Sequence, residues 1–308
     1  QNRLLEDRMT APARTIVVAT DFSPTAALAL ERACELAKLR GDKLVLAHAV
    51  SIEPVPMAGP ELLVLPVDYE AKIHEASEKA LQSLVNEIRT KGVEVTGALS
   101  MGPPVDVVLE AVKQHEADMV VIGTRGNSGF KHLLLGSVAE AVVRKCPVPV
   151  LTIHPGDERS LASIAHVIVP TDFSDEASHV LDQLAELLPA GVHPKLSLLH
   201  VYQLPVIVAP LMGFAPEMPV LAEDARDEAH KALDPLAEKL RAAGYEVEVI
   251  GREGDPSHVI SDFTESSDAD LVVMGTRGLS KIEQVLLGST AERVVQHAKC
   301  PVLTVRRS

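Results

Sequence analysis

The stretch GTRGNSGFKHLLLGS at residues 123–137 decides how the rest of the chain is interpreted, because it returns as GTRGLSKIEQVLLGS at residues 275–289. Each copy has two glycines three positions apart and a Gly-Ser pair ten positions after the second glycine. A short apolar run opened by an aspartate precedes each copy, and a helical pattern follows it. The pattern predicts a strand, a glycine-rich loop and the start of a helix.

Such a loop is a candidate phosphate site. Glycines let the backbone approach an anion closely, and free N–H groups at a helix N-terminus point toward it, with a serine hydroxyl as one more donor. The alternative is a pair of tight strand-to-helix turns that bind nothing. Three glycines and a serine repeated at one spacing favour the phosphate site. The candidate residues are Gly123, Gly126, Gly136 and Ser137 in the first copy and Gly275, Gly278, Gly288 and Ser289 in the second.

The composition limits the class of protein. A chain of 308 residues with an internal repeat is long enough for two copies of one domain. Its net charge of −14 argues against a nucleic-acid partner. The cysteines Cys34, Cys146 and Cys300 have no paired spacing and are interpreted as buried or incidental thiols in a reducing compartment. Without a long apolar run or a cleavable leader, we expect a cytoplasmic protein with no membrane span.

An aspartate follows the first strand of each copy. Residues 15–20, TIVVAT, precede Asp21-Phe22-Ser23, and residues 166–171, HVIVPT, precede Asp172-Phe173-Ser174. Each aspartate has two interpretations. We favour an N-cap of the helix that follows over a ligand-binding carboxylate at the carboxyl end of a strand in a parallel sheet, although one aspartate can serve as both.

The second strand of each copy contains a histidine. His48 and His200 stand in nearly continuous apolar runs, which favours strands covered on both faces and histidines whose hydrogen bonds are satisfied. Apolar, proline-rich loops follow at residues 51–67 and 203–220. Loops of this kind cover a ligand, a partner domain or another chain, and we favour an interface.

The remaining pattern completes an α/β domain twice. Each copy alternates five strands with four helices, with proline in the first turn of the helix at Pro104 and at Pro256. Such alternation predicts a doubly wound parallel sheet. The expected organisation is an N-terminal tail at 1–12, domains at 13–154 and 165–308, and a linker at 155–164. Residues 1–8 are interpreted as an added segment, with Met9 as the native start.

Together these features resemble a tandem universal stress protein. The resemblance covers residues 13–306 and depends on the Asp-x-Ser helix entrance, the Gly-x-Pro helix start, the glycine loop and the terminal Pro-Val-Leu-Thr strand. It implies two Rossmann-like domains with strand order 3-2-1-4-5, helices on both faces, and binding of ATP with Mg or Mn held by the phosphates. Asp21 and Asp172 would hold the ribose or adenine, and Ala49 and Val201 would offer backbone to adenine.

Differences between the copies leave the two sites open to unequal affinity. Arg125 and Arg277, between the first two glycines, would contact phosphate or pair with a helix carboxylate. The loops differ at Gly129 against Lys281. In the first strand, the copies differ by Ala19 against Pro170.

The leading functional hypothesis is an ATP-binding regulatory or protective factor in a stress response. One alternative is a slow ATPase or nucleotidyl enzyme, although the loops lack a Walker lysine and a strand-end carboxylate for a metal. Another is a scaffold or carrier that holds a hydrophobic ligand in the apolar loops. We also expect the terminal strands at 149–153 and 301–305 to pair within the chain as a pseudo-dimer, with the apolar loops joining two chains into a homodimer.

Overall fold

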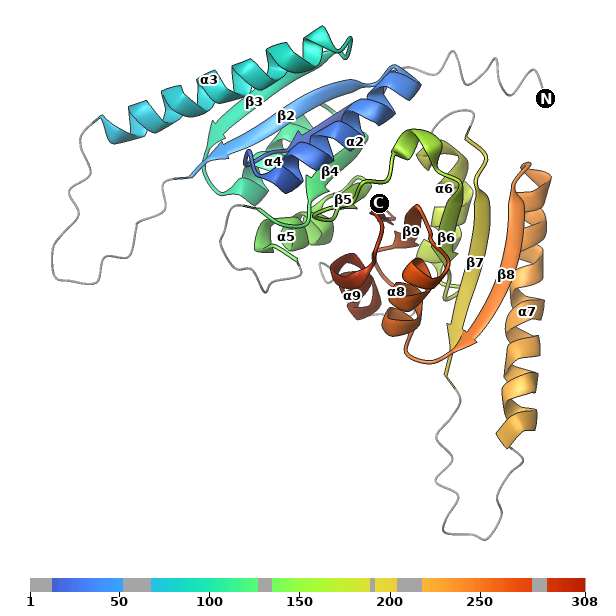
Figure 1. The fold of residues 1–308 in the computed structure, drawn as a ribbon. Helices are drawn as coiled ribbons and strands as arrows, with labels where there is room; N and C mark the ends of the chain where they lie inside the picture. Colours follow the sequence, from blue (N-terminus) through green and yellow to red (C-terminus); the bar gives the residue numbers. More distant parts are fainter. Residues whose placement is uncertain are drawn as a thin grey trace, which may run out of the picture. The chain divides into compact units, whose positions relative to one another are not determined.

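The computed structural model describes residues 13–51, 68–126, 135–188, 192–203, 218–278 and 287–307. Most of both proline-rich loops, the N-terminal tail, and the Gly129 and Lys281 positions lie outside the described residues. The chain divides into two compact units, one ending at Val142 and the other starting at Val143 (Figure 1).

The first unit is a parallel sheet with strand order β3-β2-β1-β4. Because β1 lies between β2 and β4, the chain reverses direction along the sheet after β3, as a doubly wound fold requires. Its elements are β1 (Thr15–Ala19), α2 (Pro24–Arg40), β2 (Lys43–Val50), α3 (Tyr69–Thr90), β3 (Val95–Met101), α4 (Pro104–Gln114), β4 (Met119–Gly123) and α5 (Ser137–Lys145), which runs into the second unit.

The second unit repeats this arrangement with its own fifth strand in place. The order β8-β7-β6-β9-β10 is parallel throughout and confirms the predicted 3-2-1-4-5 order for the second copy. Its elements are β5 (Val150–Ile153), η1 (Leu161–Ser163), β6 (His166–Pro170), α6 (Asp175–Leu187), β7 (Lys195–Tyr202), α7 (Met218–Ala242), β8 (Glu246–Glu253), α8 (Pro256–Ser266), β9 (Leu271–Gly275), α9 (Ser289–His297) and β10 (Val302–Val305).

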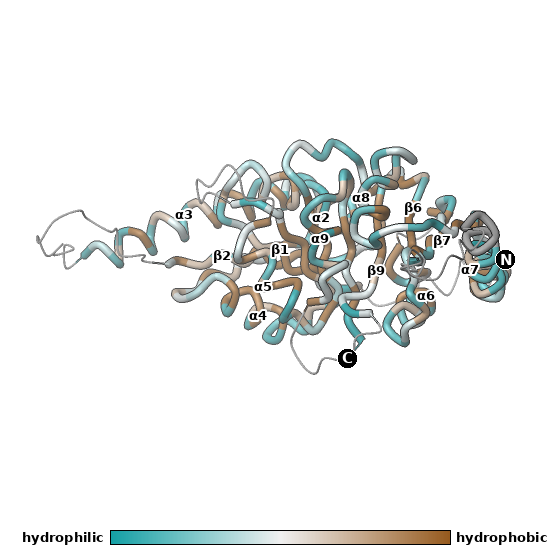
Figure 2. Tube along the Cα trace, turned by 90° about the horizontal axis from the view of Figure 1, so that it is seen from below, coloured by the Kyte–Doolittle hydropathy of each residue, from teal (hydrophilic) through white to brown (hydrophobic). Residues whose placement is uncertain are grey.

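The central strands are buried because helices cover both faces of each sheet. Figure 2 shows α2 on one face of the strands of the first unit and α4 and α5 on the other. Val17 in β1 and Val120 in β4 are fully buried, as are Val167 and Val272 in the second unit. Continuous apolar runs suit strands shielded on both sides, which explains why these segments do not alternate with polar residues.

The terminal strands of the two copies pair with each other. In the second unit β5 runs antiparallel to β10, with Leu151 opposite Leu303. The buried Thr152 hydroxyl donates to the Val302 carbonyl at 3.0 Å, and the buried Thr304 hydroxyl donates to the Val150 carbonyl at 3.1 Å. The predicted pairing of these strands is therefore observed. It covers the open edge that each strand would otherwise expose.

The favoured interpretation of Asp21 and Asp172 as helix N-caps is wrong. Ser23, and not Asp21, is the N-cap of α2, because its hydroxyl accepts the N–H of Ala26 at 3.2 Å. Ser174 caps α6 in the same way through Ala177. The aspartates are thereby left for another role. The serine is the cap because it is the residue directly before the first helical residue, where its short side chain can accept a backbone N–H of the first turn.

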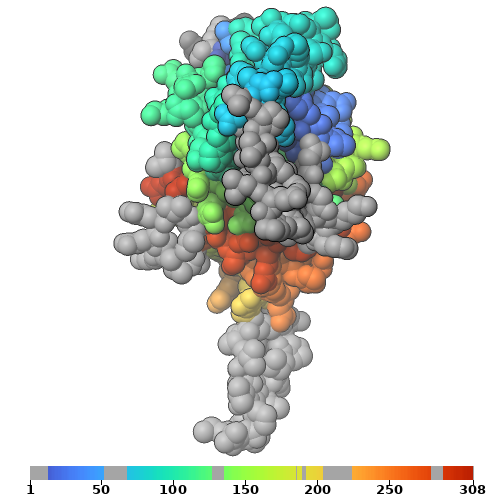
Figure 3. All heavy atoms as spheres, turned by 90° about the vertical axis from the view of Figure 1, so that its left-hand side faces the viewer, coloured from blue at the N-terminus to red at the C-terminus, as the bar shows by residue number. Residues whose placement is uncertain are grey.

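The outer surface and the thiols agree with the sequence patterns. Helix α3 presents its charged side chains at the surface, where Figure 3 shows it in cyan, with Lys79 paired to Glu75. All three cysteines are buried and unpaired, and burial raises the pKa of the Cys146 thiol to about 11. In the part of the chain that the structure describes, no helix has both the length and the apolar character to cross a membrane.

Candidate functional site

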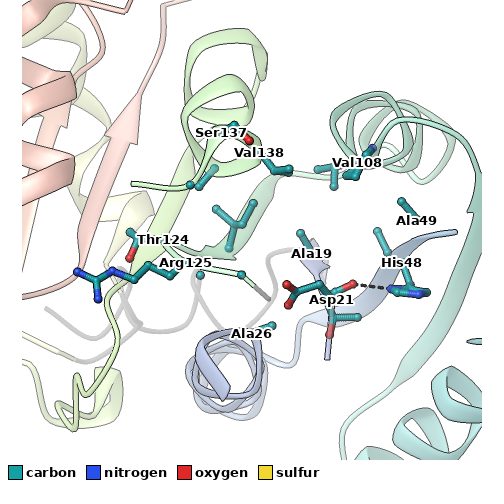
Figure 4. A pocket seen from close by; sticks show the side chains of 18 of the residues that line it. Ala19, Asp21, Ala26, His48, Ala49, Val108, Thr124, Arg125, Ser137 and Val138 are labelled. Atoms are coloured by element: carbon teal, nitrogen blue, oxygen red, sulfur yellow. Dashed lines mark hydrogen bonds between the residues drawn. The ribbon is translucent and has the colours of Figure 1, made fainter. Parts of the chain in front are cut away.

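A pocket of about 400 Å³ opens at the carboxyl ends of β1, β2 and β4 in the first unit. In a doubly wound sheet this edge, where the strand order reverses, is the usual place for a ligand. Figure 4 shows the side chain of Asp21 in the middle of the pocket, with Ser137 on one side and Ala49 on another. Its volume is within the range of pockets that bind small molecules.

Asp21 is fixed in the pocket by its own turn. Its Oδ1 accepts the backbone N–H of Ser23 at 3.0 Å. The other oxygen lies against the loop, since a Cβ on Gly126 would be 2.5 Å from Asp21 Oδ2. Glycine is therefore required at position 126 by close approach to the carboxylate. Its φ is outside the left-handed region, so the reason for glycine here is space and not backbone freedom.

A strained turn and a histidine support the end of β1. Phe22 has φ of 61°, which is rare for a large side chain, and its ring is 4.4 Å from that of His48 between centroids. His48 Nδ1 donates to the Thr20 carbonyl at 2.7 Å. The interpretation of this histidine as a residue with satisfied hydrogen bonds is confirmed. It anchors the turn that presents Asp21.

The glycine loop returns to the strand end before α5 begins. The N–H of Gly136 donates to the Thr124 carbonyl at 2.7 Å. A Cβ on Gly136 would lie 3.3 Å from the same oxygen, so the two backbone segments are close. This contact sets Ser137, the first residue of α5, at the pocket. The N-terminus of the helix thus points its free N–H groups at the space beside Asp21.

The second unit contains the same arrangement in a smaller pocket of about 220 Å³. Ser174 donates its N–H to Asp172 Oδ1 at 3.0 Å, and a Cβ on Gly278 would collide with Asp172 Oδ2. His200 Nδ1 donates to the Thr171 carbonyl at 2.8 Å. The turn before α6 repeats the positive φ at Phe173, at 62°. The second pocket therefore keeps both the carboxylate and the approach of the loop.

One acidic side chain distinguishes the second pocket. Glu176, in the first turn of α6, accepts the backbone N–H of Arg277 through Oε2 at 2.8 Å. Its Oε1 lies 3.9 Å from Arg277 Nε. The expected pairing of this arginine with a helix carboxylate is therefore observed in the second copy. In the first copy the equivalent residue is Thr25, which has no charge.

The structure brings the sequence-predicted residues of each copy together. The first pocket is lined by Asp21, Ala49, Gly123, Gly126, Gly136 and Ser137, and the second by Asp172, Val201, Gly275, Gly278, Gly288 and Ser289. Their roles toward a nucleotide stay predictions. The sequence analysis missed Val108 and Ile260, which add apolar lining from α4 and α8. It also missed Glu176, which does not itself line the second pocket but accepts the backbone N–H of Arg277, a residue that does. Aligning the two helix entrances, where glutamate faces threonine, could have found Glu176.

Comparisons with known proteins show what this chain is similar to. The model of the universal stress protein family matches residues 12–154 and 164–306. The universal stress protein Rv2623 of Mycobacterium tuberculosis is 30% identical over 312 residues, covering 95% of this chain and 96% of the relative.

Solved structures are also similar. A universal stress protein from Archaeoglobus fulgidus, at 23% identity, matches with a TM-score of 0.69 over 96% of each chain and supports the fold. A universal stress protein solved in complex with cAMP is 27% identical, covering 47% of this chain and 99% of its own, with a TM-score of 0.34.

Proposed function

Because this chain belongs to the universal stress protein family, we propose that it is an ATP-binding regulatory or protective factor with one nucleotide site in each half. The observation that carries the proposal is the convergence, at one pocket, of a fixed carboxylate, a glycine loop and a helix N-terminus. In the first half these are Asp21, Gly126 and Ser137.

Different groups in the pocket suit the phosphates, the ribose and the adenine of ATP. The loop glycines and the N-terminus of α5 supply backbone N–H donors for phosphates. Asp21 supplies a charged acceptor for ribose hydroxyls, and the end of β2 at Ala49 offers backbone to the adenine edge. The close approach of Gly126 to the Asp21 carboxylate places the loop backbone and the charged acceptor side by side in the pocket. Mg or Mn would be held by the phosphates.

This function is regulatory. The chain acts in the cytoplasm, where nucleotide occupancy changes the surface that it presents to a protein partner, including a second copy of itself. Bound phosphate would occupy the space between Asp21 and the N-terminus of α5, and so the nucleotide-bound and nucleotide-free states differ at the pocket.

Calorimetry tests the proposal directly. Full-length protein is stripped of nucleotide and titrated with ATP in the presence of Mg²⁺, with GTP under the same conditions as the control for the base. Saturable heat with ATP supports the proposal. The heat with GTP should be weaker, because the backbone contacts at the strand ends distinguish adenine from guanine. An ATP titration without binding heat at millimolar nucleotide sinks it.

A further inference from the structure

Beside the first glycine of the loop, the second copy has a mostly buried carboxylate where the first copy has a neutral side chain. Glu176 is the second residue of α6, and Thr25 is the second residue of α2. Both side chains pack against the first glycine of their loops. A Cβ on Gly123 would lie 2.9 Å from Thr25 Cγ2, and one on Gly275 would lie 3.3 Å from Glu176 Cβ. The two residues are therefore spatial equivalents, one neutral and one acidic.

The carboxylate of Glu176 already occupies a donor of the second loop. It accepts the backbone N–H of Arg277, the residue between the first two glycines, at 2.8 Å. The Arg277 Nε lies 3.9 Å from its other oxygen, and the side chains are only 12% exposed for Glu176 and 29% for Arg277. A carboxylate held there by a backbone N–H and a guanidinium takes the place of an external anion.

The first copy lacks this additional carboxylate. Thr25 brings no carboxylate, and Arg125 lines the pocket. The Nε of Arg125 is buried and has no hydrogen-bond partner within the described residues. A buried donor without an acceptor is costly, and among the described residues this Nε has no competing carboxylate contact of the kind that Glu176 makes with Arg277. The first pocket is also the larger one, at about 400 Å³ against about 220 Å³.

We propose that Glu176 is an internal competitor for the polyphosphate in the second site, so that the chain binds ATP first and more tightly in its first half. This inference depends on the proposed ATP binding and adds the order in which the sites fill. When ATP binds the second site, Glu176 must either leave its partners in Arg277 or remain close to the phosphates. The first costs a shielded ion pair and the second brings like charges together, so both lower the affinity for ATP. We expect the two dissociation constants to differ by about tenfold or more.

The test measures binding of ATP with Mg²⁺ to the nucleotide-stripped full-length chain by calorimetry. Wild type is expected to show one tight site and one weak site. Glu176→Gln keeps the shape of the side chain and removes its charge, and it is expected to tighten the weak site by about tenfold. The reciprocal Thr25→Glu is expected to weaken the tight site by about the same factor.

A neighbouring carboxylate provides the matched control. Asp175 precedes Glu176, is 88% exposed and pairs with Arg307 at 3.0 Å. Asp175→Asn removes the same charge one residue away, and its effect on either site should stay within about twofold because exposed charges are screened. A gain as large as that of Glu176→Gln would show a general charge effect and overturn the inference.

The remaining outcomes separate the two proposals. Two equally tight sites in wild type, or a weak site unchanged by Glu176→Gln, overturns the inference and leaves ATP binding intact. Failure of wild type and Glu176→Gln alike to bind ATP overturns both. Inorganic tripolyphosphate serves as a second probe, since a gain of tripolyphosphate binding in Glu176→Gln assigns the effect to the phosphate part of the site. Circular dichroism and thermal unfolding confirm that the variants are folded.

Discussion

The two halves of the chain share a backbone frame and differ in one side chain beside their glycine loops. In both, a serine caps the first helix, and a histidine donates a hydrogen bond to the backbone carbonyl just before the aspartate. In both, the second loop glycine lies so close to the aspartate carboxylate that a Cβ there would collide with it. At the entrance to the loop, however, Thr25 in one half faces Glu176 in the other. The comparison teaches that one residue can change the charge beside a site while the capping serine, the histidine and the close approach of glycine to aspartate are kept.

Substituting the second glycine of each loop should produce the largest difference in ATP affinity between the two halves. Gly126→Val would place a Cβ 2.5 Å from Asp21 Oδ2 and fill the space beside the carboxylate. We expect loss of the tight ATP site by about a hundredfold or more, measured by calorimetry. Gly278→Val, which collides with Asp172 in the same way, should affect only the weak site.

Thermal unfolding is the control for both glycine variants, since the obstructing atoms belong to a side chain at the pocket and not to the core. Equal loss of the tight site in both variants would contradict the difference between the halves. Unchanged affinity in Gly126→Val would remove the glycine loop from the site altogether.

Neutralising the pocket aspartates, Asp21 and Asp172, should produce a smaller difference in ATP affinity between the two halves. Asp21→Asn keeps an acceptor for the N–H of Ser23, which the carboxylate receives at 3.0 Å, but removes the charge offered to ribose hydroxyls. ATP should bind the first site about tenfold more weakly, because a charge-assisted hydrogen bond becomes a neutral one. Asp172→Asn should leave this tight site unchanged. Titration with ATP and with 2′-deoxy-ATP checks the assignment, and an Asp21→Asn chain with full affinity for both would refute it.

The smallest effects should be equal in the two halves, because they concern the frame. Thr152→Val and Thr304→Val each remove one buried hydroxyl that donates across the β5–β10 pair, at 3.0 and 3.1 Å. Each should lower the free energy of unfolding by about 1–2 kcal/mol, as for a buried hydrogen bond lost without a change of shape. Urea unfolding measures the loss.

ATP affinity should stay at its wild-type value in both threonine variants. A markedly larger loss from one threonine than from the other would break the symmetry of the strand pair. A change of affinity without a change of stability would link the strand pair to the pockets.

Much of this molecule is determined locally and can be predicted from the sequence. Apolar runs without alternation identify strands covered on both faces, and β1 and β4 are such strands. Helix α3 (Tyr69–Thr90) has a long, charged amphipathic pattern of the kind that identifies a helix from the sequence alone. Repetition of the glycine spacing was enough to identify the loops and to select the residues that line both pockets.

Other features were decided only when the chain folded. The choice of Ser23 over Asp21 as the cap, the approach of Gly126 to Asp21 and the pairing of Glu176 with Arg277 depend on atoms that the fold brings together. The last two join residues about a hundred positions apart in the sequence. Local patterns fix the backbone conformation of each segment, because capping, turn formation and burial act over a few residues. The charge of a binding site is the sum of side chains from distant segments, and only tertiary packing determines which of them meet.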